Sequence, residues 1–564
     1  MMSILNKTVT TACAALLVWA LIPPVFGQEN VTPNGIADNR ERAYAFTGAN
    51  IYQADGSIMN SGTLLIRAGR IVEVNENNSV PDGFFEIDLS GRYIYPGLID
   101  IYTDYGIPEL EREDNNGAAE NLFPSDQAFN VNDAIRSNFR ASTVFTHDEE
   151  ERAKYRELGF SSVLSLRPDG IARGTSALLA LGNKNTNESI VASDSAAHYS
   201  LDKGSSAQSM PSSLMGAFAL LRQTYLDAQW FDSQNPRPFT DDSLEAWIRT
   251  QELPQIMEAG NWQEALTADR IGDEFNTQYL LKTAGDSYRH ADLIKDTGAT
   301  LIVPIDFPEA PKVDDTLTAD EVSFEDLKHW ELAPFNAPIL AENDIPFAIT
   351  SSGAKADFWN NLRTAVQNGL PQNQAIDAIT RIPADALGLT ELVGQLTPLA
   401  LANFIVTTKP LFTEGSLILE NWIQGERYVI NSSYDDREGV YELVIEDQDF
   451  QLELSFNEGN PLAELILFDG ESRQVNLDLT DDLISLSFVI DNEGNRTRLS
   501  GWPEGNGWRG TGRAPNGALV DWRLIRSGNL EAEETGSGND ELAELPSPVL
   551  YPFSAYGRQA VPEQ

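Results

Sequence analysis

The sequence has very little cysteine and few basic residues. Its 564 residues include one cysteine, Cys13, and 39 lysines and arginines against 85 acidic residues. A single cysteine excludes intramolecular disulfides, so stability must come from core packing. The formal net charge of −46 argues against binding to nucleic acids or anionic membranes, which requires basic patches. The acidic residues are dispersed rather than grouped as calcium ligands, and we interpret them as a means of staying soluble in salt.

Long apolar segments are also scarce, and the clearest one lies near the start of the sequence. Residues 12–26 form an apolar run that follows Lys7, and Val25 and Gly27 are small or apolar enough for cleavage before Gln28. This pattern predicts a secretory signal peptide over residues 1–27. The run is shorter than the ~20 apolar residues that span a bilayer, and it contains two consecutive prolines. We therefore expect an exported protein, periplasmic or secreted, with no membrane span after signal cleavage.

The rest of the sequence alternates between two patterns. Residues 45–106 contain short strands and turns, including a hairpin that turns at residues 68–70. The apolar run 93–101 predicts a buried strand that enters a core. Between about residues 130 and 395, β runs alternate with helices, which is typical of a parallel sheet or barrel. The clearest helix is 214–230, because its apolar residues recur every three or four positions.

The C-terminal third returns to short strands. We expect residues 395–430 to pair with the N-terminal strands, because the two segments flank the barrel. Residues 439–527 contain seven runs in which apolar and polar positions alternate, which predicts a small antiparallel sandwich or barrel. The predicted domains are a signal peptide at 1–27, the N-terminal part of a β-sandwich at 28–97, a barrel at 98–394, the C-terminal part of the sandwich at 395–431, an antiparallel β module at 432–528, and an acidic linker with an aromatic tail at 529–564.

Several phrases of the sequence resemble the amidohydrolase superfamily. The phrase GRYIYPGLIDIYTDYG is similar to the signature "G-K-x-x-x-P-G-L-I-D-x-H-x-H", and GTLLIRAGRIVEV and FEIDLSG precede it in the family's order. The phrase IPADALGLTELVGQLTPLALANFIV resembles the family's C-terminal phrase. The resemblance covers roughly residues 45–430 and is nearest to the imidazolonepropionase-like branch. It implies an α/β fold, a distorted (β/α)8 TIM barrel with a flanking β-sandwich, to which the C-terminal antiparallel β domain is added.

The resemblance also implies a chemistry, the metal-assisted hydrolysis of carbon–nitrogen bonds other than peptide bonds. In the family a divalent ion, usually zinc, activates a water and polarises the scissile group. Its ligands are two histidines after barrel strand 1, histidines after strands 5 and 6, and an aspartate after strand 8. Some members add a carboxylated lysine or a glutamate after strand 4.

This sequence departs from that pattern at the positions that can be aligned. Tyr102 and Asp104 stand where the family has its histidine pair, and Ser352 stands where it has the aspartate. A serine hydroxyl does not take a proton from water at neutral pH, and tyrosine ligates well only when ionised, against a pKa of about 10. We therefore predict no bound metal and no cofactor. Zinc or another divalent ion would bind only in a rebuilt site.

The four histidines of the sequence are too far apart to restore a ligand pair. We expect His147 at the surface or as a helix cap, His198 in a loop, His290 on a helix, and His329 packed in a loop. Each is expected to be structural. A site rebuilt from them with Asp104 is the alternative.

Three other charged residues are candidates for a pocket. Asp169 and Arg173 follow a β run and would face the catalytic side of a barrel, where Arg173 could bind an anionic ligand. The alternative is an ordinary βα loop with a turn at residues 169–170. Asp306 ends another β run and is either a pocket residue or a helix cap. No GxSxG elbow, phosphate-binding loop or GxGxxG motif occurs, which disfavours serine hydrolases and nucleotide-binding proteins.

The β module and the terminal phrase YPFSAYGRQAVPEQ resemble parts of two-part exported bacterial amidohydrolases. There, a degenerate half and such a module precede a half with intact metal ligands, which implies an intact amidohydrolase partner chain here. Alternatively, the aromatic tail is solvated. Three hypotheses remain open: a metal-free pseudoenzyme that acts as scaffold or regulator of that partner, an active hydrolase whose metal site uses Asp104, Asp169 and Asp306, or a protein that binds a small molecule in the barrel pocket. We expect no nucleic-acid partner.

Overall fold

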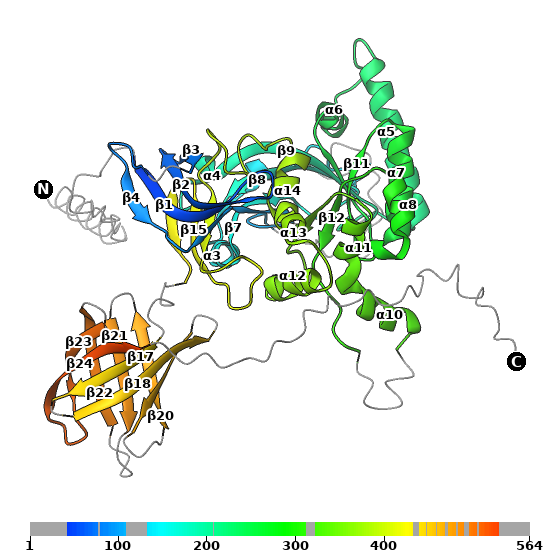
Figure 1. Cartoon of the computed structure of the whole chain (residues 1–564). Helices are drawn as coiled ribbons and strands as arrows, with labels where there is room; N and C mark the ends of the chain where they lie inside the picture. Colours follow the sequence, from blue (N-terminus) through cyan, green and yellow to red (C-terminus); the bar gives the residue numbers. More distant parts are fainter. Residues whose placement is uncertain are drawn as a thin grey trace, which may run out of the picture. The chain divides into compact units, whose positions relative to one another are not determined.

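The structure is a computed structural model of the chain (Figure 1). It describes residues 42–76, 79–108, 132–206, 208–311, 322–431, 439–446, 448–457, 460–467, 472–480, 483–489, 496–504 and 507–528. The predicted signal peptide at 1–27 and the linker and tail at 529–564 lie outside these ranges. Within them, we find no helix with the length and apolar character needed to cross a bilayer.

An eight-stranded sheet forms the centre of the main body, and helices lie around it (Figure 1). Its hydrogen-bonded order runs from β13 to β6. The strands are β6 (Leu98–Thr103), β7 (Phe160–Ser165), β8 (Ala172–Ala180), β9 (Ile190–Ser200), β10 (Gln255–Glu258), β11 (Tyr279–Lys282), β12 (Leu301–Pro304) and β13 (Phe347–Thr350). The helices are α2 (Ala141–Val144), α3 (Glu149–Glu157), α4 (Thr186–Ser189), α5 (Leu214–Ser233), α6 (Asp242–Thr250), α7 (Trp262–Glu274), α8 (Ala291–Asp296), α10 (Phe324–Leu332), α11 (Asn336–Glu342), α12 (Phe358–Gln367), α13 (Gln372–Ile379) and α14 (Arg381–Ala386).

The sheet departs from a regular (β/α)8 barrel at β8. This strand runs antiparallel to both of its neighbours, β7 and β9, whereas the other neighbouring strands are parallel. All nine residues of β8 are buried, so their backbone groups need partners within a sheet. The sequence predicts that Arg173 follows a strand in a loop, and this is wrong, because Arg173 lies on β8 itself.

The carboxyl group of Asp100 connects the first and last strands of this sheet. Asp100 lies on β6 and is completely buried. It accepts hydrogen bonds from the Thr350 hydroxyl at 2.6 Å, and from the backbone N–H and hydroxyl of Ser351 at 3.0 and 2.5 Å. The backbone N–H of Tyr102 donates a fourth bond at 3.2 Å. Burial raises the pKa of Asp100, although these hydrogen bonds act in the opposite direction.

A second eight-stranded sheet combines strands from both ends of the barrel segment. Its order is β16-β15-β14-β5-β1-β2-β3, with β4 paired to β1. The strands are β1 (Ala43–Tyr52), β2 (Ile58–Arg67), β3 (Arg70–Asn75), β4 (Phe85–Asp88), β5 (Tyr93–Pro96), β14 (Phe404–Thr407), β15 (Ile418–Ile423) and β16 (Glu426–Val429). Strand β14 pairs antiparallel with β5, which confirms the predicted pairing of the two flanking segments. The rings of Phe46, Phe404 and Trp422 pack together between 4.9 and 5.5 Å apart.

The apolar run 93–101 does not form the single buried strand that its hydrophobicity predicts. It divides at Gly97 into β5 of the flanking sheet and β6 of the barrel. The chain passes so close to neighbouring residues here that a Cβ atom at Gly97 would collide with the Ser161 hydroxyl. The backbone N–H of Gly97 donates to the carbonyl oxygen of Asn403 at 2.9 Å. Apolar character alone cannot show that a buried run changes sheets.

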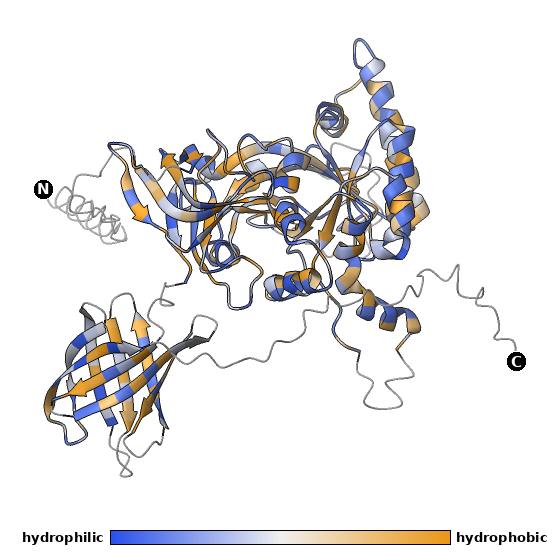
Figure 2. Ribbon diagram, in the orientation of Figure 1, coloured by the Kyte–Doolittle hydropathy of each residue, from blue (hydrophilic) through white to orange (hydrophobic). Residues whose placement is uncertain are grey.

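The C-terminal segment forms a closed antiparallel barrel. Its strands are β17 (Gly439–Ile445), β18 (Gln448–Asn457), β19 (Asn460–Ile466), β20 (Ser472–Thr480), β21 (Leu483–Val489), β22 (Arg496–Glu504), β23 (Gly507–Arg513) and β24 (Leu519–Gly528). Apolar and polar residues alternate along them (Figure 2), and the apolar side chains fill the interior. The predicted pattern contains seven of these strands and misses β23, because three of its seven residues are glycine and leave little alternation to recognise.

Replacement of Asp100 by asparagine tests the link between the barrel ends. One carboxyl oxygen accepts the N–H of Tyr102 and the other accepts the N–H of Ser351, so either amide orientation points an NH2 group at a donor. We expect Asp100→Asn to lower the free energy of unfolding by about 2–3 kcal/mol in urea titrations. The control Asp88→Asn changes an exposed side chain that accepts from Ser90, and should have little effect. Equal stability of the two variants would contradict this role of Asp100.

Candidate functional site

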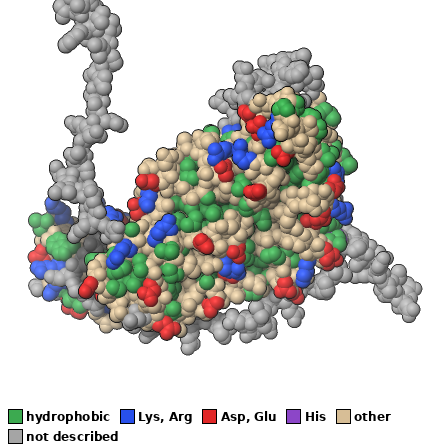
Figure 3. Space-filling view, turned by 90° about the horizontal axis from the view of Figure 1, so that it is seen from above, with side chains coloured by type: hydrophobic (Ala, Val, Ile, Leu, Met, Phe, Trp, Pro, Cys, Tyr) green, Lys and Arg blue, Asp and Glu red, His purple; other side chains and the backbone are tan. Residues whose placement is uncertain are grey.

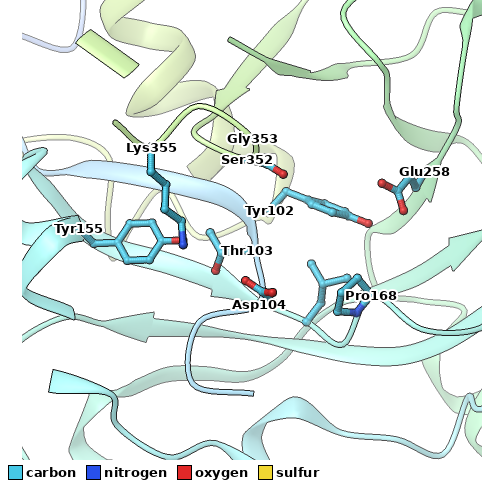
Figure 4. A pocket seen from close by; sticks show the side chains of 10 residues that line it. Tyr102, Thr103, Asp104, Tyr155, Pro168, Glu258, Ser352, Gly353 and Lys355 are labelled. Carbon is cyan, nitrogen blue, oxygen red and sulfur yellow. The ribbon is translucent and has the colours of Figure 1, made fainter. Parts of the chain in front are cut away.

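A pocket of about 310 Å³ opens at the carboxyl ends of the barrel strands (Figure 4). It is lined by Tyr102, Thr103, Asp104, Tyr155, Leu166, Pro168, Glu258, Ser352, Gly353 and Lys355. The structure thus brings together the three aligned positions Tyr102, Asp104 and Ser352. The first two lie at the end of β6, and Ser352 follows β13, so the hydrogen bonds of Asp100 hold both sides of the pocket together.

An ion network adjoins this pocket through Tyr102 and Glu258, which line it. Arg173 Nη1 donates to Glu258 Oε2 at 2.6 Å and to the Tyr102 hydroxyl at 2.8 Å. Lys282 Nζ donates to Glu258 Oε1 at 3.0 Å, and it lies 5.4 Å from the centre of the Tyr102 ring. Each of the four residues comes from a different strand, β8, β10, β6 and β11. Together, two cations flank a single carboxylate.

This arrangement sets the protonation states in the pocket. Burial alone would raise the pKa of Glu258, but Arg173 and Lys282 lower it to about 2. Burial raises the pKa of Tyr102 well above its usual value, although Arg173 acts in the opposite direction. At neutral pH, Glu258 is therefore ionised and the Tyr102 hydroxyl keeps its proton. Neither group can exchange a proton readily near pH 7.

The residues of the pocket do not fit a catalytic divalent ion. Tyr102 is protonated, Ser352 is a neutral hydroxyl, and both oxygens of Glu258 already accept from cationic side chains. A catalytic zinc ion usually has three protein ligands drawn from histidine, carboxylate and cysteine. In the part of the chain that the structure describes, no three histidine, cysteine or acidic side chains are close enough to form such a group.

The barrel interior also contains His198, which the sequence predicts in a loop. This prediction is wrong, because β9 continues through residues 196–200 and pairs with β10. His198 is 1% exposed, and its ring centre lies 5.9 Å from that of Tyr102. Burial, with a smaller contribution from Arg173, lowers the pKa of His198 to about 3, so the imidazole is neutral at pH 7. Neither ring nitrogen has a hydrogen-bond partner among the described residues.

The other three histidines lie elsewhere in the fold. Residue His147 is not the cap of α3, because the Asp148 side chain accepts from the N–H of Glu151 in that role. His147 instead packs against Phe145, with ring centres 4.9 Å apart. His329 lies on α10 rather than in the predicted loop. His290 ends a short 3-10 helix, Ser287–His290, in agreement with the predicted helix, and its ring packs on Trp262.

The remaining predicted candidates are separated from each other. Asp169 accepts from Arg136 Nη1 at 2.5 Å and from the N–H of Ser205 at 2.6 Å, so it holds neighbouring loops together. Asp306 follows β12 and lies beside Gly353 at the pocket, where a Cβ atom would collide with the aspartate. A metal site that uses Asp104, Asp169 and Asp306 together is therefore not supported by their positions in the described part of the chain.

Sequence reasoning did not identify Glu258 and Lys282. Each ends a strand of four residues, in QIME and YLLK. The signal that could have identified them is a charged residue directly after a short apolar run. Such a residue lies at the carboxyl end of a strand, which faces the active side of a barrel. Tyr155 on α3 and Lys355, which donates to Glu151 at 2.6 Å, also line the pocket without a recognisable motif.

Replacement of Glu258 by glutamine tests the ion network. The change leaves buried Arg173 without its anionic partner, and we expect a loss of about 3 kcal/mol in the free energy of unfolding at pH 7. The depressed pKa of Glu258 stabilises the fold above the unfolded value of about 4.3, and this contribution is lost as pH falls towards 2. The difference between wild type and Glu258→Gln should therefore narrow over this window.

Urea titrations at several pH values measure this difference. The control Glu274→Gln removes the carboxylate of an exposed ion pair with Arg222 and should cost less than about 1 kcal/mol. A difference between wild type and Glu258→Gln that stayed constant between pH 7 and pH 2 would show that Glu258 is not held ionised by its neighbours.

Comparisons with known proteins agree with this architecture. An amidohydrolase from Thermotoga maritima matches with a TM-score of 0.53 and 18% sequence identity. The match covers 68% of this chain and 99% of the Thermotoga protein. A prolidase complexed with N-methylphosphonate-L-proline matches with a TM-score of 0.41 and 14% identity, over 69% of this chain and 99% of the prolidase. The A. niger ochratoxinase matches with a TM-score of 0.40 and 12% identity, over 69% of this chain and 96% of the ochratoxinase. Both matches are too weak to carry an argument. No family model and no curated protein matches the chain. The chain has the amidohydrolase fold.

Proposed function

We propose that this chain is an exported, degenerate member of the amidohydrolase superfamily that acts as scaffold or regulator of an intact amidohydrolase partner. The observation that carries the proposal is the ion network of Arg173, Glu258, Lys282 and Tyr102. It occupies the strand ends at which the family binds its metal. Two cationic side chains there repel a divalent ion, and they use the carboxylate that would otherwise bind it.

The same network leaves the pocket without an effective general base near neutral pH. A general base works best when its pKa is close to the operating pH. Glu258, with a pKa of about 2, holds a proton too weakly, and Tyr102 releases its proton only at high pH. This supports a protein that has kept the barrel and lost the hydrolytic reaction.

A second candidate function is the binding of a small anionic molecule in the pocket. Arg173 and Lys282 carry two positive charges against the single negative charge of Glu258. Buried charge is costly unless it is compensated. The hydroxyls of Thr103 and Ser352 offer hydrogen bonds to such a ligand. Small carboxylates are the ligands to test. A rise in Tm that increases with their concentration would favour this function over a purely structural barrel.

Metal content is the first test of the proposed function. The full-length protein, purified without a metal-binding tag and dialysed, is measured by elemental mass spectrometry. We expect less than ~0.1 divalent ion per chain, whereas a catalytic zinc site would approach one. Near-stoichiometric zinc, manganese or iron would contradict the proposal and favour an active enzyme, with Asp104 as the first residue to replace.

A double replacement tests whether the aligned histidine positions alone explain the missing chemistry. We expect Tyr102→His with Asp104→His to remain inactive towards a panel of simple amides and cyclic imides, even with added zinc. Ser352 and the Glu258 network would still be unsuited to metal. Wild type under the same conditions is the control. Turnover at least tenfold above wild type would show that the other positions do not block the site.

A further inference from the structure

The charges of the C-terminal barrel are distributed unevenly along its sequence. Residues 439–495 contain fourteen acidic residues and one arginine, whereas residues 496–528 contain six arginines and two acidic residues. The second segment forms the adjacent strands β22, β23 and β24. In contrast, acidic and basic side chains are interspersed over much of the face in Figure 3. A chain with a net charge of −46 thus gathers positive charge on three strands.

The strand register brings four of these arginines to one outer face. Arg498 on β22 is directly opposite Arg513 on β23, and Arg509 on β23 is directly opposite Arg523 on β24. All four are exposed, and the residues that alternate with them along the strands are mostly buried. We call the surface formed by Arg498, Arg509, Arg513 and Arg523 the arginine face.

The arginine face is unfavourable for the isolated fold. Like charges directly opposite each other destabilise an antiparallel pair. Asp521 lies on the same face between the two pairs, and Glu442 of β17 lies at its edge, opposite Ile525. Among the described residues, neither acid forms an ion pair with Arg498 or Arg523. A ligand that brings carboxylates to this face would compensate the repulsion.

The strands beneath the face are held closely together. The Trp522 indole donates to the carbonyl oxygens of Ser500 on β22 and Thr511 on β23, at 3.2 and 3.3 Å. The inward position Gly510 leaves no room for a side chain, because a Cβ atom would collide with the carbonyl oxygen of Ser500. The arginines are therefore anchored on a backbone that loses little freedom when a ligand binds.

Exposed apolar side chains accompany the arginines. Trp502 is 56% exposed and lies directly opposite Arg509. Leu519 is opposite Arg513, and Ile525 lies two residues beyond Arg523 on β24, both exposed. Arginine and tryptophan are enriched among residues that contribute most to protein–protein binding. This composition favours a protein partner over a purely electrostatic ligand.

We propose that the arginine face binds a short acidic segment of a partner protein. Guanidinium groups bind carboxylates with two parallel hydrogen bonds, which gives such a segment both affinity and register. The three strands span only about 10 Å, and the flanking strands β17 and β21 add no basic residue. A nucleic acid or an anionic bilayer would extend beyond the arginines over a chain with a net charge of −46, whereas a short peptide places its charges over the arginines alone. The inference rests on the proposed scaffold function for the existence of a partner.

The test measures binding of a fluorescent peptide of ten glutamates to the full-length chain by anisotropy. We expect saturable binding that weakens at least tenfold between about 0.05 and 0.5 M salt. The double variant Arg498→Glu and Arg523→Glu should weaken binding at least tenfold. Each replacement turns a like-charge pair into an opposite-charge pair, so the Tm should stay equal or rise. A structural defect would instead lower the Tm.

Two further variants keep the result interpretable. Lys154→Glu with Lys295→Glu makes the same change of charge at exposed sites of the main body, and should alter affinity less than twofold. If the Arg498→Glu and Arg523→Glu variant has a lower Tm, Arg498→Gln with Arg523→Gln removes the charges without adding new ones. Unchanged affinity in the folded arginine variants would overturn the proposal.

Other occupants are distinguished in the same assay. Tighter binding of a 20-base-pair DNA duplex, or of vesicles with anionic lipid, would overturn the acidic-peptide assignment. Residues 529–564 contain six acids between positions 531 and 544 and could themselves occupy the face. A tenfold gain in peptide affinity when the chain is ended at Gly528 would assign the face to this segment and would overturn the proposal of a partner protein. Metal content is independent of these variants, so failure of peptide binding and failure of the metal-free proposal remain distinguishable.

Discussion

The buried carboxyl group of Asp100 is the contact on which the barrel and its pocket depend. It joins β6 to β13 through the Thr350 and Ser351 donors, and all of these groups lie away from water. Leaving any of them unpaired would cost the full desolvation penalty, so the spacing between the two strands is well defined. Because Tyr102 lies two residues after Asp100 and Ser352 directly follows Ser351, the same contact determines where both sides of the pocket lie.

Charge inside the pocket then decides its chemistry. A metal-dependent barrel surrounds an external cation with neutral imidazoles and carboxylates. Here the cations belong to the chain, since Arg173 and Lys282 both contact Glu258. Such a buried ion pair is weak evidence for stability, because desolvation opposes the attraction. Its consequence is chemical, since it lowers the pKa of Glu258 and leaves no carboxylate oxygen of that residue free of a cation.

The C-terminal barrel applies the same physics at a surface. Apolar side chains fill most of its described interior, and the four arginines lie on its outside. Directly opposed arginines on β22, β23 and β24 weaken the pairing that forms the barrel, and Trp522 compensates by binding two strands from within. The proposed scaffold function then divides between two parts of the chain, a barrel with lost hydrolytic groups and a surface suited to an acidic partner.

The sequence by itself determined the kinds of element and their order. Alternation of β runs and helices predicts the barrel, the helix at 214–230 is α5, and the hairpin at residues 68–70 forms where Ala68 and Gly69 both have positive φ. The family's signature also places Tyr102 and Ser352, which line the same pocket. These features are local, because propensity, turn chemistry and motif spacing act over neighbouring residues.

Only the tertiary structure decided which residues meet. Arg173, Glu258 and Lys282 are separated by up to about a hundred residues in sequence and come together because β8 runs antiparallel beside β9. The burial of His198 and the division of the run 93–101 at Gly97 likewise depend on neighbours distant in sequence. Burial and Coulomb interactions between distant residues set the pKa values in the pocket, and no local pattern records them.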